Sequence, residues 1–431
     1  MHPISPYGCN PDTYIAAPSF LNKGYTQIRV VCQFVPDPRY AQTSTLLNSK
    51  IYFFGGGNTK ESKFMDEMVY LDLASLNSSK PLWVKNPIGI PSAEILATSC
   101  ISPIDKSTIF LIGGQALDKT KQNIINATLV YTFNSITSQW TTINAAGFYN
   151  YSISLVRMQA IMNNDGKIYI FGGNEVDYTV GNNNYGPSIN KMNVLDTKTL
   201  TWSSLNITNN FPTPRVSYTA TLLNNGLIIY IGGFEMKTYG YANVDMNEQI
   251  NGDTIASRNA HSAVLTNDGH IIIFGGNSAN STSRTTTLRA QPDVAVLNTN
   301  ISPYRWSIPN ISSTNSPQSL CFHSAEIYNN IMIIAFGIVT SDQLQTTATL
   351  NKNIYLFDVQ NYAWISLTTP TSTKSTSTNN HSNYMIIGIS VGVSGFIIIL
   401  GLIGVVYKYK KLRKTIIEMP GTDYYPIVTT K

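Results

Sequence analysis

The stretch IYIFGG at residues 168–173 is one of six similar phrases in this chain. Each phrase is a run of β-branched and aromatic residues that ends in glycine, which is typical of a buried strand entering a turn where only glycine tolerates a positive φ or close packing. The other copies are IYFFGG (51–56), IFLIGG (109–114), IIYIGG (228–233), IIIFGG (271–276) and the degenerate MIIAFG (332–337). The doubled glycines expected to be structural are Gly55, Gly56, Gly113, Gly114, Gly172, Gly173, Gly232, Gly233, Gly275 and Gly276.

Other features recur in a fixed order around this phrase. A strand upstream begins near an arginine, and a strand downstream ends in a turn that is followed by a tryptophan. These tryptophans are Trp83, Trp140, Trp202, Trp306 and Trp364, which follow their glycines by 28, 27, 30, 31 and 27 residues. At a repeating position they are expected to pack as wedges between neighbouring sheets, and Asp72, Asp196 and Asp358 are expected to form turns.

The order strand, strand with Gly-Gly, strand, strand with Trp resembles the kelch repeat, over roughly residues 38–367. Kelch repeats fold as four-stranded blades of a β-propeller, in which each sheet buries its faces against its neighbours. The resemblance therefore implies an all-β, six-bladed kelch-type β-propeller.

The fourth repeat departs from the pattern. Its step to the next glycine pair is 43 residues, against 58 to 62 for the others, and no tryptophan lies between Gly233 and Arg258. A β-hairpin is missing, and the loss is placed near Ile250 and Asn251. We expect a truncated, thin fourth blade there and a local gap in the ring.

Galactose oxidase, a copper-radical enzyme, has a propeller of similar architecture, and the resemblance raises the same activity as an alternative. That chemistry needs two histidines, two tyrosines and a cysteine, whereas His261 and His323 occupy positions where kelch repeats often carry a structural histidine. The chain has no HExxH, P-loop or dinucleotide motif. We therefore predict no catalytic residue, no metal and no cofactor.

Binding is the function class that remains. A propeller displays loops on a rigid ring, which suits recognition of a protein or a glycan. The longest polar inserts follow the Gly-Gly pairs at 173 and 276. The predicted binding residues are Tyr178, Asn183, Tyr185, Arg284 and Arg289.

The C-terminal part reads as a membrane anchor. Residues 384–407 form an uncharged run of 24 residues, long enough for one transmembrane helix. The sequence thus divides into an N-terminal segment (1–37), the propeller (38–367), a Ser/Thr-rich stalk (368–383), the span (384–407) and a basic tail (408–431). Gly388 and Gly392 form a GxxxG pair through which two spans could dimerise.

Charge sets the expected orientation. Lysines and an arginine follow the span directly, so the tail is predicted to be cytosolic and the propeller extracellular or luminal. Eight N-x-S/T sequons agree with this orientation: Asn77, Asn126, Asn150, Asn206, Asn280, Asn300, Asn310 and Asn380. The first residues lack the features of a signal peptide, so the sequence is expected to be incomplete at its N-terminus. The alternative is a tail-anchored scaffold that faces the cytosol.

Composition argues against two further classes. Much of the net charge of +5 comes from the tail, so no nucleic-acid partner is expected. The four cysteines, Cys9, Cys32, Cys100 and Cys321, lack the spacing of a zinc site, and Cys9 and Cys32 are either a disulfide or free thiols.

Overall fold

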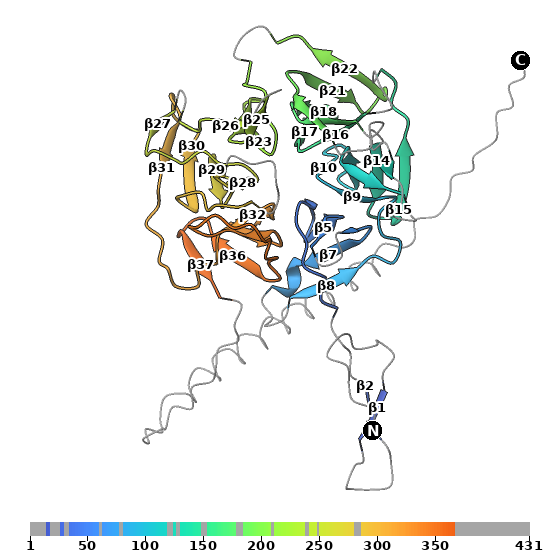
Figure 1. The fold of residues 1–431 in the computed structure, drawn as a ribbon. Helices are drawn as coiled ribbons and strands as arrows, with labels where there is room; N and C mark the ends of the chain where they lie inside the picture. The colour runs from blue at the N-terminus through green and yellow to red at the C-terminus, as the bar shows by residue number, and fades with distance from the viewer. Residues whose placement is uncertain are drawn as a thin grey trace, which may run out of the picture. The chain divides into compact units, whose positions relative to one another are not determined.

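The computed structural model describes residues 14–17, 26–29, 34–59, 63–76, 81–118, 124–125, 130–147, 153–177, 184–207, 211–237, 241–247, 250–279 and 286–366. Apart from one 3₁₀ turn at Leu73–Ser75, every regular element in these residues is a β-strand. The all-β prediction is therefore confirmed. Figure 1 shows the strands as arrows coloured along the chain.

Six sheets follow one another in sequence, one for each glycine phrase. Sheet one contains β3 (Thr43–Leu47), β4 (Lys50–Phe54), β7 (Met68–Asp72) and β8 (Leu82–Lys85). Sheet two contains β10 (Thr98–Ile101), β11 (Thr108–Ile112), β14 (Val130–Asn134) and β15 (Gln139–Ile143). Sheet three contains β17 (Ala160–Met162), β18 (Lys167–Phe171), β21 (Met192–Asp196) and β22 (Thr201–Leu205).

The remaining sheets differ in strand number. Sheet four contains only β23 (Thr219–Leu222) and β24 (Ile228–Ile231). Sheet five contains β28 (Ser262–Leu265), β29 (His270–Phe274), β30 (Val294–Asn298), β31 (Arg305–Ser307) and β27 (Asn251–Gly252). Sheet six contains β33 (Ser324–Tyr328), β34 (Ile331–Ala335), β36 (Ile354–Asp358) and β37 (Ala363–Ile365).

Short strands form a second tier beyond the Gly-Gly turns. These small sheets are β5 (Gly57–Asn58) with β6 (Lys63–Phe64); β9 (Ala93–Ile95), β12 (Gln115–Leu117) and β13 (Ile124–Ile125); β16 (Ile153–Val156), β19 (Asn174–Asp177) and β20 (Asn184–Ser188); β25 (Phe234–Met236) with β26 (Tyr241–Asn243); and β32 (Leu320–Cys321) with β35 (Ile338–Val339). A separate hairpin, β1 (Tyr14–Ala17) with β2 (Thr26–Arg29), precedes the first sheet. The chain thus crosses from a large sheet to a small one after four of the five glycine pairs and after Gly337, whereas after Gly276 Asn277 forms isolated bridges.

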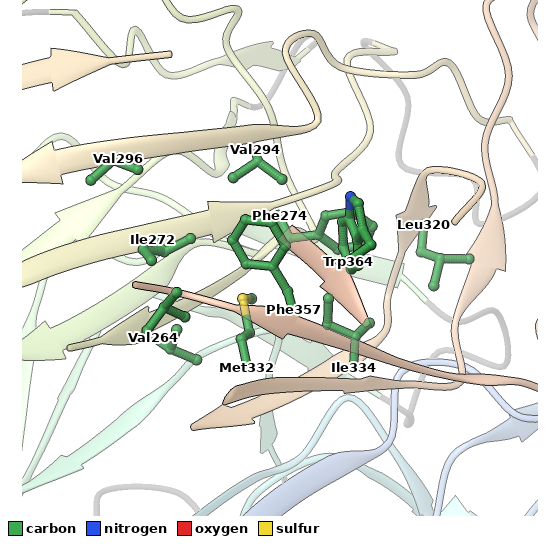
Figure 2. Packing of buried hydrophobic residues seen from close by; sticks show 11 residues of the cluster. Val264, Ile272, Phe274, Val294, Val296, Leu320, Met332, Ile334, Phe357 and Trp364 are labelled. Carbon is green, nitrogen blue, oxygen red and sulfur yellow. The ribbon is translucent and has the colours of Figure 1, made fainter. Parts of the chain in front are cut away.

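The hydrophobic core lies between neighbouring sheets. Figure 2 shows the cluster between sheets five and six, in which Phe274 of β29 packs against Trp364 of β37 with ring centroids 5.4 Å apart. The other tryptophans lie in equivalent clusters, and Trp306 Nε1 also donates to the Met246 carbonyl at 2.9 Å. Each sheet therefore buries its faces against the next one, as a repeat architecture requires.

The first strands of the six sheets close a cycle. Each contacts the first strand of the next sheet, and β33 of sheet six contacts β3 of sheet one. At the start of each large sheet one residue with a positive φ donates its N–H to the equivalent carbonyl of the preceding repeat. These bonds run from Ala41 to Phe322 (2.9 Å), Leu96 to Ala41 (2.9 Å), Arg157 to Leu96 (3.2 Å), Ser217 to Arg157 (2.8 Å), Ala260 to Ser217 (2.8 Å) and Phe322 to Ala260 (2.9 Å).

The fourth sheet corrects one prediction. It is truncated as expected, but the expected gap in the ring is absent at its inner edge, because Ser217 and Ala260 keep the hydrogen-bonded cycle continuous. The chain after β26 instead runs along sheet five, where β27 pairs in parallel with β31. Residues 250 and 251, where the loss was placed, thus lie beside an intact neighbouring sheet.

Several predicted features fall outside the described residues: the N-terminal segment except residues 14–17, 26–29 and 34–37, the stalk, the span at 384–407 with Gly388 and Gly392, and the basic tail. Within the part of the chain that the structure does describe, no helix has the length and apolar composition needed to cross a membrane.

Candidate functional site

A cavity of about 120 Å³ lies where the six repeats meet. Two residues from each repeat line it: Ala41, Gln42, Leu96, Ala97, Arg157, Met158, Ser217, Tyr218, Ala260, His261, Phe322 and His323. A space of this size holds a few water molecules and no drug-sized ligand. The cavity is thus a narrow point on the axis of the ring.

The polar side chains of this cavity link neighbouring repeats. Gln42 Nε2 donates to Ser324 Oγ at 2.9 Å, and His323 Nε2 lies 2.8 Å from Ser262 Oγ. His261 Nε2 lies 3.0 Å from Thr219 Oγ1 in the same arrangement. Each bond joins one sheet to the preceding one, so these groups act as struts.

Burial also sets the charge of the two histidines. It lowers the pKa of His323 to about 3 and holds the pKa of His261 well below its usual range, with Arg258 adding to the shift at His261. Both imidazoles are therefore neutral at neutral pH. Among the residues that the structure describes, no group of three His, Cys, Asp or Glu side chains has the arrangement of a metal site.

A cluster around Arg157 lies among the small sheets at the Gly-Gly end. The guanidinium carbon of Arg157 is 4.3 Å from the centroid of the Tyr185 ring and 6.0 Å from that of Phe234. Tyr185 donates its hydroxyl to Gln115 Oε1 at 3.2 Å. The cluster thus joins the second, third and fourth repeats through a cation-π contact. Sequence reasoning missed Arg157, although it precedes Gly172 by 15 residues, as Ser217 precedes Gly232 and Ala260 precedes Gly275.

Arg289 forms a second link between repeats. Its Nε donates to Asp293 Oδ1 at 2.9 Å, and its Nη1 lies 3.5 Å from Asp342 Oδ1 in the sixth repeat. Its backbone N–H donates to the Ser341 carbonyl at 2.8 Å. Two carboxylates thus neutralise this cation, which lowers its value for binding an anionic ligand.

The structure places only part of the predicted binding set. Tyr185 lies on β20 in the third repeat and Arg289 in the fifth, and neither contacts the other in the interactions observed. Tyr178, Asn183 and Arg284 lie outside the described residues. The set as a whole stays a prediction.

Of the glycosylation candidates, Asn206, Asn300 and Asn310 are exposed. The other five lie outside the described residues: Asn77, Asn126, Asn150, Asn280 and Asn380. Cys100 and Cys321 are free thiols, whereas Cys9 and Cys32 also lie outside the described residues.

A groove of about 360 Å³ lies on the outer part of sheet three, on the side of the two-stranded sheet four. Phe211 lines it and packs on the Phe171 ring at 5.3 Å, and Tyr230 of β24 packs on the same ring at 5.3 Å. The corresponding space between sheets one and two holds Trp140, and that between sheets four and five holds Trp306. The groove is lined by Asn190, Lys191, Ser204, Leu205, Asn206, Ile207 and Phe211.

Comparison with known proteins supports the repeat. Residues 41–249 match a family model described as the KLHDC2/KLHL20/DRC7 Kelch-repeats domain. A solved structure titled "Structure of YjhT" superimposes with a TM-score of 0.51 at 14% identity, covering 77% of this chain and 98% of that one. At this identity the likeness shows the fold alone.

Two curated proteins of Arabidopsis thaliana are also similar. Acyl-CoA-binding domain-containing protein 4 is 21% identical over 288 residues, which cover 63% of this chain and 38% of the relative. Acyl-CoA-binding domain-containing protein 5 is 22% identical over 326 residues, which cover 70% of this chain and 44% of the relative. The chain therefore spans less than half the length of either relative.

Proposed function

We propose that the chain, whose residues 41–249 match a kelch-repeat family model, is a non-catalytic recognition scaffold: a six-bladed kelch propeller with a truncated fourth blade, which binds a protein or a glycan through the loops at its Gly-Gly end. One observation carries the proposal. The polar side chains at the axis bridge adjacent sheets, as Gln42 does to Ser324 and His323 to Ser262. Such an axis is a rigid support for loops.

The chemistry of the buried groups supports a role without catalysis. Burial raises the pKa of the Cys100 thiol to about 12 and raises that of Cys321 as well, so neither is a thiolate at neutral pH. The copper-radical alternative needs a cysteine cross-linked to a tyrosine beside two metal-binding histidines. His261 and His323 instead each bind a hydroxyl of the neighbouring sheet.

A peroxide assay tests the enzymatic alternative. The full-length protein, loaded with copper, is supplied with galactose, and peroxide release is measured. We expect no release above a copper-free sample. Stoichiometric copper together with galactose-dependent peroxide would overturn the non-catalytic function.

Membrane attachment is part of the proposal. The uncharged run at 384–407 and the basic residues after it favour one span with the propeller outside the cytosol. We expect the native protein to resist extraction by alkaline carbonate and to lose mass on treatment with an N-glycosidase. An extraction-resistant protein without glycans would favour the tail-anchored, cytosolic scaffold.

The ligand-binding loops are tested on a glycan array and on extracellular protein libraries, probed with the full-length chain in detergent. Asn183→Ala changes the long insert after Gly173 in the third repeat, whereas Asn225→Ala changes the turn between β23 and β24 in the fourth repeat. We expect Asn183→Ala to weaken retention of any ligand found and Asn225→Ala to leave it unchanged. Weaker retention with Asn225→Ala and unchanged retention with Asn183→Ala would contradict a binding face at the Gly-Gly end.

A further inference from the structure

The second strand of sheet four has a free outer edge. In the five other large sheets the second strand pairs with a third one, as β18 does with β21. Within the described residues, β24 pairs only with β23. An unpaired strand edge is a template for another extended chain.

The direction of the backbone groups follows from the pairing. N–H and C=O groups alternate sides along a strand, and Leu227 C=O accepts from Leu223 N–H on the inner side. The N–H groups of Ile229 and Ile231 therefore point inward to β23, and those of Ile228, Tyr230 and Gly232 point outward. No described residue accepts from these three outward N–H groups, whereas the equivalent Gly172 N–H donates to Lys191 C=O at 3.1 Å.

The side chains at this edge are also incompletely covered. Ile228, Ile229 and Tyr230 are half-buried, whereas four of the five residues of β29 are buried. Leu227, directly before the strand, is 52% exposed. β24 contains no lysine, arginine or proline, although such residues commonly protect the edge strands of natural β-sheets from pairing with other chains.

The neighbouring sheets limit what can reach this edge. Beyond their second strands, sheet three continues for two further strands and sheet five for three. At about 4.8 Å per strand, β24 is recessed by roughly 10 Å. A second copy of the whole ring cannot bring its own β24 into this recess, whereas an extended segment can enter it.

The third strands of the five other large sheets indicate which residues a strand paired with β24 should carry. Their third strands read MVYLD, VYTFN, MNVLD, VAVLN and IYLFD. The fourth residue is always Leu or Phe and is buried, and the fifth is always Asp or Asn. We propose that the free edge of β24 captures an extended segment of a partner polypeptide with this pattern, which adds an antiparallel third strand to sheet four.

The pairing of second and third strands in the other large sheets predicts how the partner segment aligns with β24. In sheet three Leu195 lies opposite Ile168 and Asp196 opposite Lys167. The same offsets from the glycine pair place the partner's Leu or Phe opposite Ile228 and its Asp or Asn opposite Leu227. This site is separate from the loops at the Gly-Gly end. Its test therefore does not depend on which ligand binds to those loops.

A peptide from the chain itself is the probe. A fluorescent peptide with the sequence of residues 191–205, KMNVLDTKTLTWSSL, is titrated into the full-length chain in detergent, and anisotropy is measured. We expect saturable binding that slows hydrogen exchange at Ile228, Tyr230 and Gly232 and leaves Ile229 and Ile231 unchanged. A peptide carrying Leu195→Asp is the matched control and should bind at least tenfold more weakly.

A protein variant completes the test. Ile228→Pro removes an outward N–H and leaves the inward bonds to β23 intact, because proline is tolerated on the free side of an edge strand. We expect at least tenfold weaker peptide binding. Absence of binding to the natural sequence, equal binding of both peptides, or protection at residues other than Ile228, Tyr230 and Gly232 would each overturn the proposal.

Discussion

At the scale of single residues, a carbonyl oxygen explains why five of the six phrases end in two glycines. The Arg215 carbonyl accepts the N–H of Gly173 at 3.1 Å, and a Cβ on Gly172 would lie 2.5 Å from the same oxygen. Both glycines also have positive φ, +66° and +80°. The predicted reason for glycine, a positive φ with close packing, is confirmed, and the neighbour that approaches is the next repeat.

Gly172→Ala tests this contact. Its cost combines the left-handed backbone, about 1–2 kcal/mol, with displacement or loss of the buried bond from Gly173 to Arg215, about 1–3 kcal/mol more. Gly226→Ala is the matched control, because Gly226 has a φ of +86° but nothing within 4 Å of an added Cβ. Urea unfolding should show a larger loss of stability for Gly172→Ala. Equal losses would mean that the carbonyl contact adds nothing.

Glu94 occupies the position that Arg39, Arg215 and Arg258 hold in other repeats. It is 2% exposed, and burial raises the pKa of its carboxyl to about 8, with the Ser92 hydroxyl opposing the shift. The folded state therefore holds a proton that the unfolded chain releases above its ordinary pKa of 4.5. This contribution favours folding at low pH and is lost as the pH rises towards 8.

Glu94→Gln should remove that pH dependence. The variant should gain stability relative to the natural sequence as the pH rises from 5 to 8, by at most about 1.4 kcal/mol per pH unit. Glu175→Gln, at an exposed position on β19, controls for the loss of charge. Denaturant unfolding at several pH values measures the difference. Parallel curves for Glu94→Gln and the natural sequence would contradict a buried, protonated carboxyl.

At the scale of elements, the order of strands in each repeat was predictable because its signals are local. Apolar runs mark the second strands, and Asp196 forms the predicted turn by accepting from the N–H groups of Lys198 and Thr199 at 2.9 and 3.2 Å. The small second-tier sheets were missed. Strands such as β5 and β35 are two residues long, too short to show any period in the sequence.

The tryptophans differ in burial, which predicts different costs of removal. Trp306 is 1% exposed and bonded to Met246, whereas Trp202 is only half-buried. Trp306→Ala should cost about 3–5 kcal/mol, and Trp202→Ala clearly less. Urea unfolding of the two variants measures both. A smaller loss for Trp306→Ala would contradict its role as a wedge between sheets four and five.

At the scale of the whole molecule, closure of the ring depends on contacts between residues far apart in the chain. Ala41 donates to Phe322, and Gln42 bonds to Ser324, which is 282 residues away. No local pattern reveals the positive φ of Ala41 or Leu96, because non-glycine residues hold it only where the surrounding structure imposes it. The repeat predicted that the sheets stack, but the bonds that join the last sheet to the first required the structure.

The predicted site was less accessible to sequence reasoning than the fold. Loop length drew attention to Tyr185 and Arg289, but their surroundings depend on other repeats, through Arg157 and Asp342. Side chains that meet across repeats have no fixed spacing in the sequence. The glycine phrases therefore predicted the strands but not the residues that contact the loop side chains.

Residue-resolved hydrogen exchange of the full-length protein tests the closed ring most directly. The amides of Ala41, Leu96, Arg157, Ser217, Ala260 and Phe322 should all exchange slowly, because each is bonded to the neighbouring repeat. The decisive comparison is Ala41, whose acceptor belongs to the last sheet, with Leu96, whose acceptor belongs to the preceding one. Closure predicts similar protection at both, and rapid exchange at Ala41 beside a protected Leu96 would contradict it.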